Sequence, residues 1–507
     1  MALIPSSSEN WALYNSIDSA VTYHIWEDIK DDLPNMGYSD IYRQTMDLYP
    51  AVVFMMTTGL LVDKERLAIE HKRISDLQQA AEDELNELSG GLNALSPKQC
   101  IAYFYGTLGQ AVLTGGTGKP TTDDKAMARL ARRGIREASL VQSIRSYNKL
   151  KGTYLEVETD RDGRVRTSYN LRGTREGRLS SSQNIFGTGM NLQNLHPVFK
   201  GFIVSDPGHI FIELDKRQSE WVISAYASGD ANMIAAIERG EDVHTATGHM
   251  ITGVPKDLIK REAKLIGHHS DPDIIMAARH EFLPEIFELA RFLPRSMTCR
   301  QGGKKSNHGL NYIMKFRRFA LENEIPEAEA KTIVEAYLEG YPGLKAWWKR
   351  IEAKLARDRT LVNCFGRPRR FLDQWGEDLI KAAVAFIPQS TNADLVNQAI
   401  IKTYNDDAPY MQPLRMSAQV HDSILNQYPV GRWGECAQAI MREREHLNPL
   451  MVYEGREFRV ETDMKIGLNW GEYSENDNPL GMVEIPIGDN VTELADRLEA
   501  QYNEFRG

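Results

Sequence analysis

The spacing of apolar and polar positions divides this 507-residue chain into helical and strand-like stretches. From about residue 60 to 150 the pattern is helical, and from about 160 to 215 it is strand-like, as in HIFIELD at 209–215. From about 220 to 400 it is helical again, and strands return between 414 and 468. This order predicts an α+β fold in which a large helical insertion interrupts one sheet.

Two predicted helices have an apolar stripe along one side. The first, YPGLKAWWKRIEAKLARD, covers 341–358, and the second, DNVTELADRLEAQYNEFR, covers 489–506. We expect the second helix to pack on its own domain rather than on a partner. Its apolar side is formed by Val491, Leu494, Leu498, Tyr502 and Phe505.

The segment MSAQVHDSILNQYPV, at 416–430, predicts two strands joined by a tight turn. His421 and Asp422 occupy the apex, where a plain hairpin would use Asn-Gly or Asp-Gly. Either Asp422 simply favours a turn and His421 is a surface residue, or Asp422 is held at the strand tip as half of a metal site. The dipeptide alone leaves both interpretations open.

A second carboxylate stands at a strand end in FIELDKRQSEWVISAYASGD. The predicted strand ends at Asp215, and the helix that follows carries Glu220. A sheet fixes the position of a carboxylate at its edge, which suits cation binding. Paired with Asp422, Asp215 would hold two Mg²⁺ ions about 4 Å apart for phosphoryl transfer. Each Asp taken alone is more often structural.

In RQGGKKSNHGLNYIM, four functional side chains recur every fourth residue. They are Arg300, Lys304, His308 and Tyr312, and this spacing predicts one face of one helix. The two cations suit a triphosphate, and the two rings suit a sugar and a base. The alternative, a charged helix face that is merely hydrated, is the more common use of such residues.

Composition is ordinary for a globular protein, with 42% hydrophobic and 26% charged residues. The four cysteines have no CxxC spacing, which argues against a zinc site and a disulfide framework. No apolar run approaches the roughly 20 residues that span a bilayer, and the N-terminus lacks a signal or transit pattern. These features predict a cytoplasmic protein without a membrane partner.

The net charge of the whole chain is −10, which argues weakly against a nucleic-acid partner. The charged residues are, however, unevenly distributed along the chain. Residues 125–151 contain eight Lys or Arg and one acid, Glu137, whereas nine acids follow from Glu472 onwards against Arg497 and Arg506. The net charge of a whole chain can conceal a basic groove when an acidic tail balances it. For the basic run, DNA binding and simple solvation are about equally good interpretations.

Several segments, in order from about Met56 to Glu472, resemble those of family A (DNA polymerase I-like) DNA polymerases. Each segment is moderately specific, and their shared order makes coincidence improbable. The matching segments are TTGLLVDKERL, LSPKQ, KLKGTYL, RTSYNLRGTREGRLSSS, NLQNLHP, LDKRQSE, EDVHTATG, the Arg300–Tyr312 run, YPGLKAWWKR, FGRPRRF, PQSTNADLVNQA and QVHDS.

The resemblance implies an α+β right-hand polymerase fold, with an antiparallel palm sheet, helical fingers and a helical thumb. It also implies template-directed DNA synthesis in a bacterial or phage-infected cell, on primer-template DNA with dNTPs. The expected divisions are a remnant or docking segment 1–50, thumb 51–160, palm 161–224 and 376–475, fingers 225–375, and an acidic C-terminal extension 476–507.

The resemblance also assigns roles. Asp215 and Asp422 would bind two Mg²⁺ ions, for which Mn²⁺ may substitute, and Arg300 and Lys304 would hold the triphosphate, with Lys304 also acting as an acid. The remaining assignments concern the new base pair and the DNA. They are His308 at the sugar, Tyr312 near the templating base and bonded to Glu220, Glu220 against ribonucleotides, Arg178 and Gln389 in the minor groove, His421 and Thr153 on the primer, and Lys149 and Lys151 on the DNA.

Some positions depart from the family pattern. Ser423 stands where these DNA polymerases usually have Glu. The related single-subunit RNA polymerases tend to have Ser at this position, whereas Glu220 favours a DNA polymerase. RNA polymerase therefore remains a minority alternative, and a catalytically dead scaffold on primer-template DNA is another. Ile313 replaces a usual Gly, and residues 256–294 are longer than the usual link into the nucleotide-binding helix.

Near the N-terminus, Tyr14 and Asp18 have the Tyr-x-x-x-Asp spacing of the last proofreading-exonuclease motif. The Asp-x-Glu motif that should precede it is missing from this sequence. We therefore expect neither a 3′–5′ exonuclease nor a 5′ nuclease in this chain. A separate exonuclease subunit would dock near residues 1–50, and a processivity factor is another expected partner. A compact, divergent polymerase of this kind suggests a phage or another mobile replicon.

Overall fold

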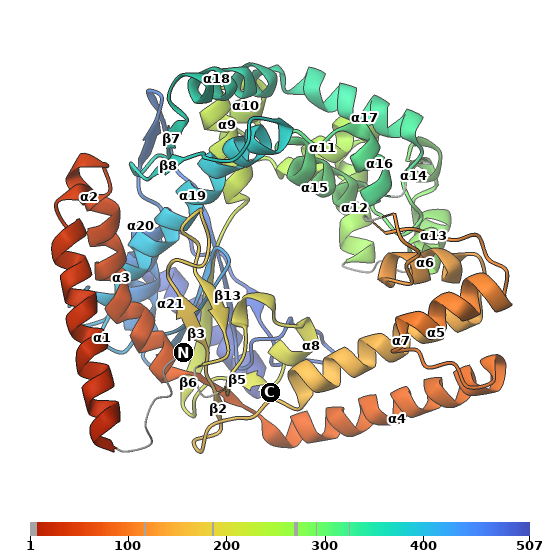
Figure 1. Cartoon of the computed structure of the whole chain (residues 1–507), viewed down its shortest axis with the longest axis horizontal. Helices are drawn as coiled ribbons and strands as arrows, with labels where there is room; N and C mark the ends of the chain where they lie inside the picture. Colours follow the sequence, from red (N-terminus) through yellow and green to blue (C-terminus); the bar gives the residue numbers. More distant parts are fainter. Residues whose placement is uncertain (1–7, 116–117, 185–186, 268–271, 291, 324) are drawn as a thin grey trace.

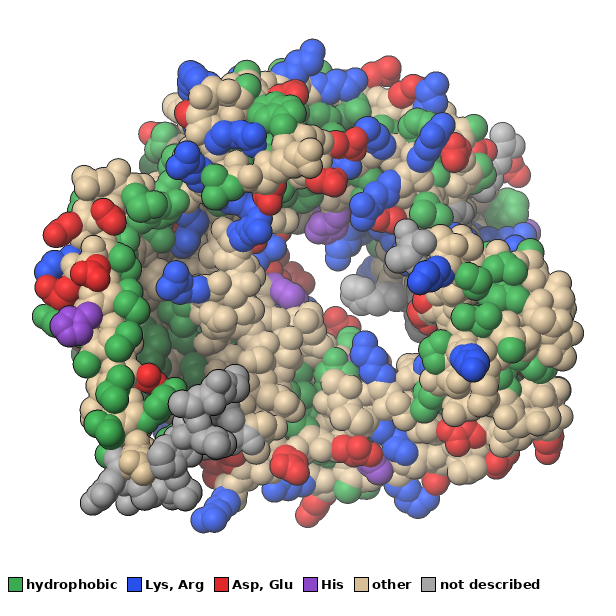
Figure 2. Space-filling model, in the orientation of Figure 1, with side chains coloured by type: hydrophobic (Ala, Val, Ile, Leu, Met, Phe, Trp, Pro, Cys, Tyr) green, Lys and Arg blue, Asp and Glu red, His purple; other side chains and the backbone are tan. Residues whose placement is uncertain are grey.

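The structure is a computed structural model of the whole chain and describes residues 8–115, 118–184, 187–267, 272–290, 292–323 and 325–507. Its elements surround a central opening, which is seen through the molecule in Figure 2. A sheet backed by helices lies on one side, a group of helices that we call the arch lies above, and a group that we call the arm lies below (Figure 1).

Five antiparallel strands form the main sheet, in the order β14-β13-β6-β10-β9. Along β6 the side chains alternate: Ile210, Ile212 and Leu214 are fully buried, whereas Glu213 and Asp215 lie on the opposite face. The strand predicted at 209–215 is therefore confirmed. The strand bounds are β6 His209–Lys216, β9 Arg415–Val420, β10 Ser423–Pro429, β13 Thr462–Gly467 and β14 Val483–Glu484.

Three helices back this sheet: α19 (Glu377–Tyr404), α20 (Trp433–Leu447) and α21 (Val491–Arg506). The helix predicted at 489–506 packs on α20 within its own chain, as expected, with Leu494 and Leu498 fully buried. The C-terminal segment also adds β14 to the edge of the sheet. Apolar residues of the sheet and these helices form one continuous core.

The arm contains a long antiparallel helix pair with a smaller helical group at its tip (Figure 1). Asp63 caps the first long helix by accepting a hydrogen bond from the Arg66 amide at 3.0 Å. The tip has its own apolar core. The bounds are α4 Lys64–Ser89, α5 Pro97–Ile101, α6 Asp124–Arg132 and α7 Arg136–Leu150, with π-helical turns at Ala102–Thr107 and Lys151–Leu155.

Ten helices that the structure describes between residues 219 and 358 form the arch, which confirms the predicted helical insertion. The helix predicted at 341–358 is α18, which buries Leu344, Trp347, Ile351 and Leu355 on one side. The bounds are α9 Ser219–Ser228, α10 Ala231–Glu238, α11 Val243–Thr252, α12 Lys256–Ile266, α13 Pro272–Phe282, α14 Pro284–Leu289, α15 Cys299–Leu310, α16 Phe316–Asn323, α17 Glu327–Gly340 and α18 Pro342–Asp358.

Short strands and helices connect these parts. Two of the strands interrupt the helical pattern after α18, where the sequence predicted helix up to about residue 400. Near the N-terminus, α1 and α3 lie side by side, with the rings of Trp26 and Tyr42 stacked 4.9 Å apart (Figure 1). The remaining bounds are α1 Ser8–Ile29, α2 Asp32–Asn35, α3 Ser39–Thr58, α8 Pro197–Lys200, β1 Leu60–Val62, β2 Arg164–Val165, β3 Ser168–Asn170, β4 Ser180–Ser182, β5 Ile203–Val204, β7 Thr360–Val362, β8 Pro368–Arg370, β11 Met451–Tyr453, β12 Arg456–Phe458 and a 3₁₀ turn at Leu192–Asn194.

Candidate active site

The β9–β10 hairpin ends in the predicted tight turn. Val420 pairs with Ser423, which leaves His421 and Asp422 as a two-residue turn. On its other side β10 pairs with β6, and Ser423 stands opposite Asp215. This register brings the end of β6 next to the hairpin tip, so that Asp215 and Asp422 line one cavity of about 670 Å³. The interpretation of Asp422 as only a turn former is the weaker one.

Contacts from distant segments hold the tip in its conformation. His421 has a φ of 54°, which residues other than glycine rarely adopt. Its amide donates to the Gln193 side chain at 2.9 Å, and its carbonyl accepts from Gln419 at 2.6 Å. The Tyr169 hydroxyl donates to the Gln419 carbonyl at 2.9 Å. These bonds offset the backbone strain and fix the direction of the tip.

The two carboxylates lie close together at the floor of the cavity. Burial there, together with the charge of Asp422, raises the pKa of Asp215. Burial also raises the pKa of Asp422, although a hydrogen bond from the Ser219 hydroxyl, at 3.1 Å, opposes that shift. Two carboxylates whose charge is disfavoured by burial and by neighbouring carboxylates form a site that a cation stabilises.

Helix α15 forms the opposite wall of the cavity. It begins at a capping box, in which Thr298 accepts from the Gln301 amide at 3.2 Å and the Gln301 side chain accepts from the Thr298 amide at 3.0 Å. Gly303 lets α15 approach α11, because a Cβ at this position would lie 2.1 Å from the His244 carbonyl oxygen. Asn307 fixes the helix further by accepting from Trp221 at 3.0 Å.

The predicted row of four side chains on α15 is correct for three of them. Arg300, Lys304 and His308 lie on the helix, but α15 ends at Leu310, so that Tyr312 stands in the turn that follows. The helix therefore ends before Tyr312, the fourth residue of the predicted row. All four side chains still line the same cavity.

An ion pair holds Arg300. Its Nε lies 2.7 Å from an Asp242 carboxylate oxygen, and Asp242 also accepts from the Thr245 hydroxyl at 2.6 Å. Although burial opposes the change, these hydrogen bonds lower the pKa of Asp242 to about 2. Burial lowers the pKa of His308, which favours its neutral imidazole at neutral pH. The cationic wall therefore consists of Arg300 and Lys304.

Tyr312, Glu220 and Arg178 form a connected group beside the carboxylates. The Tyr312 hydroxyl donates to Glu220, as predicted, and the other Glu220 oxygen pairs with Arg178. Burial and the Glu220 charge raise the pKa of Tyr312 well above its ordinary value, so its proton stays in place. Ile313, which follows, has a φ of 60°, a conformation that the usual glycine would adopt without strain.

The cavity thus gathers nine of the predicted site residues. They are Arg178, Asp215, Glu220, Arg300, Lys304, His308, Tyr312, His421 and Asp422. Four others are outside its lining. Gln389 is partly buried on α19, and Lys149, Lys151 and Thr153 lie at the end of α7 and in the π-helical turn after it.

The sequence pattern that defines DNA polymerase family A matches residues 64–267 and 286–472 of this chain. The chain belongs to DNA polymerase family A. The predicted membership is confirmed. Family A DNA polymerases I among the curated proteins include the thermostable enzyme of Thermus aquaticus, 27% identical over 85% of this chain and 48% of that protein, and that of Pseudomonas aeruginosa, 27% identical over 75% and 39%. The chain spans less than half the length of these two relatives.

A solved structure has the same fold. It is described as the POL domain of Pol1 from M. smegmatis in complex with DNA primer-template and dNTP. It matches 87% of this chain and 73% of its own length, with a TM-score of 0.71 and 23% identity. The predicted α+β fold, with its antiparallel sheet and its helical parts, is confirmed. We call the sheet the palm, the arch the fingers and the arm the thumb, as the resemblance names them.

Several residues of this family A site escaped the sequence analysis. Asp242 lies in the segment EDVHTATG, and Ser219 lies one residue before Glu220, yet neither had a recognisable spacing to its partner. Gln193 and Asn307 act through contacts with distant segments. All four residues lie inside family-like segments, and only that position could have singled them out.

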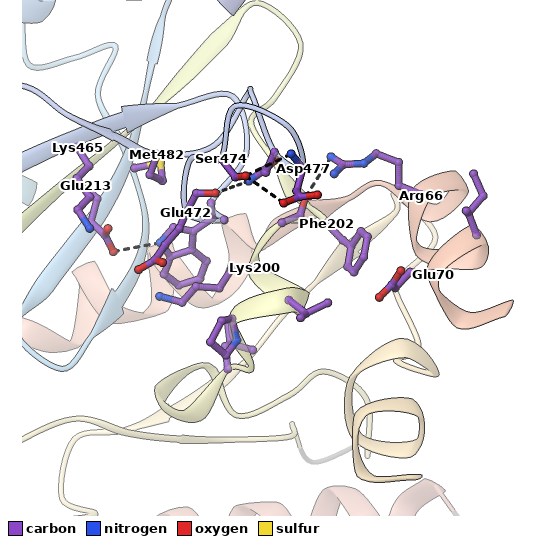
Figure 3. Close-up of a pocket in the computed structure, with 18 of the residues that line it drawn as sticks. Arg66, Glu70, Lys200, Phe202, Glu213, Lys465, Glu472, Ser474, Asp477 and Met482 are labelled. Atoms are coloured by element: carbon purple, nitrogen blue, oxygen red, sulfur yellow. Dashed lines mark hydrogen bonds between the residues drawn. The ribbon is translucent and has the colours of Figure 1, made fainter. Parts of the chain in front are cut away.

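A larger cavity, of about 1040 Å³, lies beside the palm, between the base of α4, α8 and the loop after β13 (Figure 3). Several of the charged or aromatic side chains that line it have partners within the chain. Arg73 pairs with Glu70 at 2.6 Å, Lys200 lies 4.4 Å from the centre of the Trp470 ring, and Trp470 donates to Glu213 at 3.1 Å. The Asp215–Asp422 pair and the cations of α15 belong to the other cavity.

Within the described ranges, no three His, Cys, Asp or Glu side chains form a ready metal cluster in this family A chain. In the same ranges, none of the helices has both the length and the apolar character needed to cross a bilayer.

Proposed function

We propose that this chain catalyses template-directed DNA synthesis, adding deoxynucleotides to a primer 3′-hydroxyl. The observation that carries the proposal is the cavity between palm and fingers. It combines the Asp215–Asp422 pair, two cations on α15 and the Tyr312–Glu220 pair. Carboxylates that face cations across a cavity of this size suit a nucleoside triphosphate.

Asp215 and Asp422 would hold two Mg²⁺ ions, with Mn²⁺ as a substitute. The oxygen donors suit these hard cations, and the raised pKa values of both carboxyls indicate that negative charge there lacks compensation. Two carboxylates supply only part of a coordination shell, which leaves room for water and phosphate oxygens. The bound ions would activate the 3′-hydroxyl and neutralise charge on the leaving pyrophosphate.

The residues of α15 would bind the triphosphate and assist the leaving group. In the reaction the primer 3′-oxygen forms a bond to the α-phosphorus while the bond from that phosphorus to the bridging oxygen breaks. Arg300 would hold the phosphates through its planar guanidinium, which Asp242 orients. Lys304, exposed to the cavity, would donate a proton to the departing pyrophosphate oxygen.

The group around Glu220 would test the sugar and the base pair. Glu220 would fill the space that a ribose 2′-hydroxyl needs, and Tyr312 would hold it there by its hydrogen bond. His308 would face the sugar. Minor-groove contacts are proposed for Arg178 and Gln389, primer contacts for His421 and Thr153, and DNA contacts for Lys149 and Lys151.

The minority alternative, an RNA polymerase, rests on Ser423. Ser423 is buried, and its hydroxyl donates to the Val420 carbonyl at 3.0 Å. This contact gives Ser423 no direct role toward the sugar, whereas Glu220 lines the cavity. The alternative of an inactive scaffold is weakened by the paired carboxylates, because DNA binding alone requires phosphate contacts and no such pair.

Extension of a labelled DNA primer on a DNA template with Mg²⁺ tests the proposal, with dNTPs in one reaction and rNTPs in the other. We expect extension with dNTPs only. Robust extension with rNTPs would favour the RNA polymerase alternative. No extension in either reaction, with primer-template still bound, would favour the scaffold.

A second protein partner, either an exonuclease subunit or a processivity factor, stays a prediction. In residues 8–50 the helix α1 exposes large apolar side chains, among them Trp11, Ile17 and Val21, each about half exposed. This part of the chain contains eight acidic and two basic residues. An apolar protein groove with a basic rim would complement it, whereas DNA and a second acidic copy would be repelled.

A further inference from the structure

The segment that leads into α15 forms a small helical unit with its own apolar core. Helices α12, α13 and α14 lie next to α15 at the end of the arch nearest the arm (Figure 1). Their core includes Ile259 and Ile286 and extends to Cys299, the first residue of α15. Leu293 also packs on α15, because a Cβ on Gly302 would lie 3.4 Å from its side chain. The unit therefore supports the first turn of α15 on its buried side.

Part of this unit lies outside the family A pattern. The pattern matches residues up to 267 and resumes at 286, so that α13 (Pro272–Phe282) belongs to the unmatched interval. The interval falls within residues 256–294, which the sequence indicated to be unusually long for a link into this helix. A contact that α13 makes with α15 is therefore a feature of this chain, and the family pattern does not supply it.

A buried ion pair joins α12, α13 and the start of α15. Glu262 on α12 is fully buried, and Arg279 on α13 is only 3% exposed. The Arg279 guanidinium lies 2.6 Å from one oxygen of the Glu262 carboxylate and also donates to the Met297 carbonyl at 2.9 Å. The other Glu262 oxygen accepts from the Cys299 amide at 2.7 Å. The pair thus holds both the chain that enters α15 and the first amide of the helix.

These contacts determine where Arg300 stands. The Cys299 amide is one of the amides at a helix start that have no acceptor within the helix, and the helix dipole makes this end positive. The Glu262 carboxylate satisfies that amide, and Arg279 offsets its charge, because a buried charge without a partner is costly. Arg300 follows Cys299 directly and lines the carboxylate cavity. A displaced pair would therefore displace the guanidinium of Arg300 in the cavity.

We infer that Glu262 and Arg279 are positioning residues for the incoming nucleotide, which hold the first turn of α15 so that Arg300 meets the triphosphate. The inference rests on the proposed function, which supplies the dNTP. Both residues are buried and stand apart from the cavity lining, so they act through Arg300 and not by contact with the nucleotide. Asp242 orients the Arg300 guanidinium, and the buried pair fixes the backbone that carries it.

The test variant combines Glu262→Met and Arg279→Met in the full chain. Apolar side chains of similar size replace a buried ion pair without leaving an unpaired charge, so the variant should fold, but the hydrogen bonds to the start of α15 are lost. Arg279→Lys, which keeps a cation opposite Glu262, is the conservative variant. The control combines Arg261→Met and Glu281→Met, at exposed positions of the same two helices. Thermal unfolding checks that each variant folds like the parent.

The measurement is the equilibrium affinity for dNTP, with Mg²⁺, of the chain bound to primer-template DNA. The primer ends in a dideoxynucleotide, so no transfer occurs. Lost hydrogen bonds to a charged group and a displaced Arg300 predict an affinity about 10–100-fold weaker in the double methionine variant. Its affinity for the DNA should stay that of the parent. The lysine variant should recover part of the dNTP affinity, and the exposed control pair should bind dNTP like the parent.

The same substitutions in an Arg300→Ala background separate positioning from general damage. If the pair acts through Arg300, the two methionines should change dNTP affinity by less than about twofold in a chain that already lacks this guanidinium. An equal loss in both backgrounds would overturn the inference, because the pair would then act on the fingers as a whole. Parent-like affinity of the double methionine variant would also overturn it.

These binding measurements need no nucleotide addition. A parent chain that binds dNTP but fails to extend primers would overturn the proposed function, while the comparison of backgrounds still decides the inference. A parent that extends primers, together with a methionine variant of unchanged dNTP affinity, would overturn the inference alone. A parent that binds no dNTP would overturn both.

Discussion

The hydroxyl of Tyr312 donates a hydrogen bond to the carboxylate of Glu220, 92 positions earlier in the chain. Arg178 engages the other oxygen of the same carboxylate. Glu220 is therefore held between the fingers and a loop of the palm, at the side of the cavity that also contains Asp422. Its position depends on both partners, which makes it a fixed wall of the cavity.

Replacement of Glu220 by Ala should relax discrimination against ribonucleotides. The side chain that would collide with a 2′-hydroxyl is removed, and steric discrimination of this kind is worth about 1–3 kcal/mol, or roughly 10–200-fold. The ratio of kcat/KM for dNTP to kcat/KM for rNTP measures it. Glu238→Ala on the neighbouring helix α10 is the control. An unchanged ratio in the Glu220 variant would remove this residue from sugar selection.

Asp422→Asn should abolish primer extension without weakening DNA binding. The amide keeps the shape of the side chain but removes the charge that would hold a divalent cation. We expect a loss of about a thousandfold or more in the rate of addition. Single-turnover extension and equilibrium binding to primer-template DNA measure the two properties. Asp477→Asn, in the larger cavity, is the control; persistent extension by the Asp422 variant would refute its assignment as a metal ligand.

Asp242→Asn should raise KM for dNTPs more than it lowers kcat. Asparagine still caps α11, since Asp242 accepts from the His244 amide at the helix start, but the ion pair with Arg300 is lost. Hydrogen bonds to charged groups contribute about 1.5–3 kcal/mol, so KM should rise at least about tenfold. Steady-state kinetics test this against Asp257→Asn, at the start of α12. Equal effects of the two substitutions would contradict a positioning role.

Stability should decrease with pH because of one buried acid. Burial raises the pKa of Glu443 from 4.5 to about 8, and its only recorded hydrogen bond comes from Asn426 at 2.8 Å. Between these two pH values the folded chain keeps a proton that the unfolded chain releases. The free energy of unfolding contributed by Glu443 is therefore full below about pH 4.5 and is lost as pH rises through about 8.

Glu443→Gln stays neutral and should flatten this dependence. Urea unfolding at several pH values between about 5 and 8 measures the difference between the variant and the parent. Glu499→Gln, at an exposed position of α21, should retain the slope of the parent. If the Glu443 variant keeps the same slope, other groups carry the pH dependence.

Local patterns in the sequence determined much of the fold. An apolar strand-like run that ends in Glu-Leu-Asp indicated β6 with Asp215 near its end, and a 3.6-residue period fixed α18 and α21. The order of the family-like segments predicted the family A fold. These features depend on residues close together in the chain, where backbone geometry alone sets which side chains share a face.

Only the tertiary structure decided which distant groups meet. The partners of Arg300 and Glu220 lie 58 and 92 positions away, and Gln193 reaches the amide of His421 across 228 positions. The same holds for Glu262, which reaches the amide of Cys299 across 37 positions. Such pairings follow from the packing of separate cores. The periodicity of a segment shows on which face of its helix or strand a side chain lies, but not which other segment will pack against that face. The sequence by itself therefore determined most of the elements and placed Asp215 and Asp422 at strand ends, and the folded chain decided how they are held.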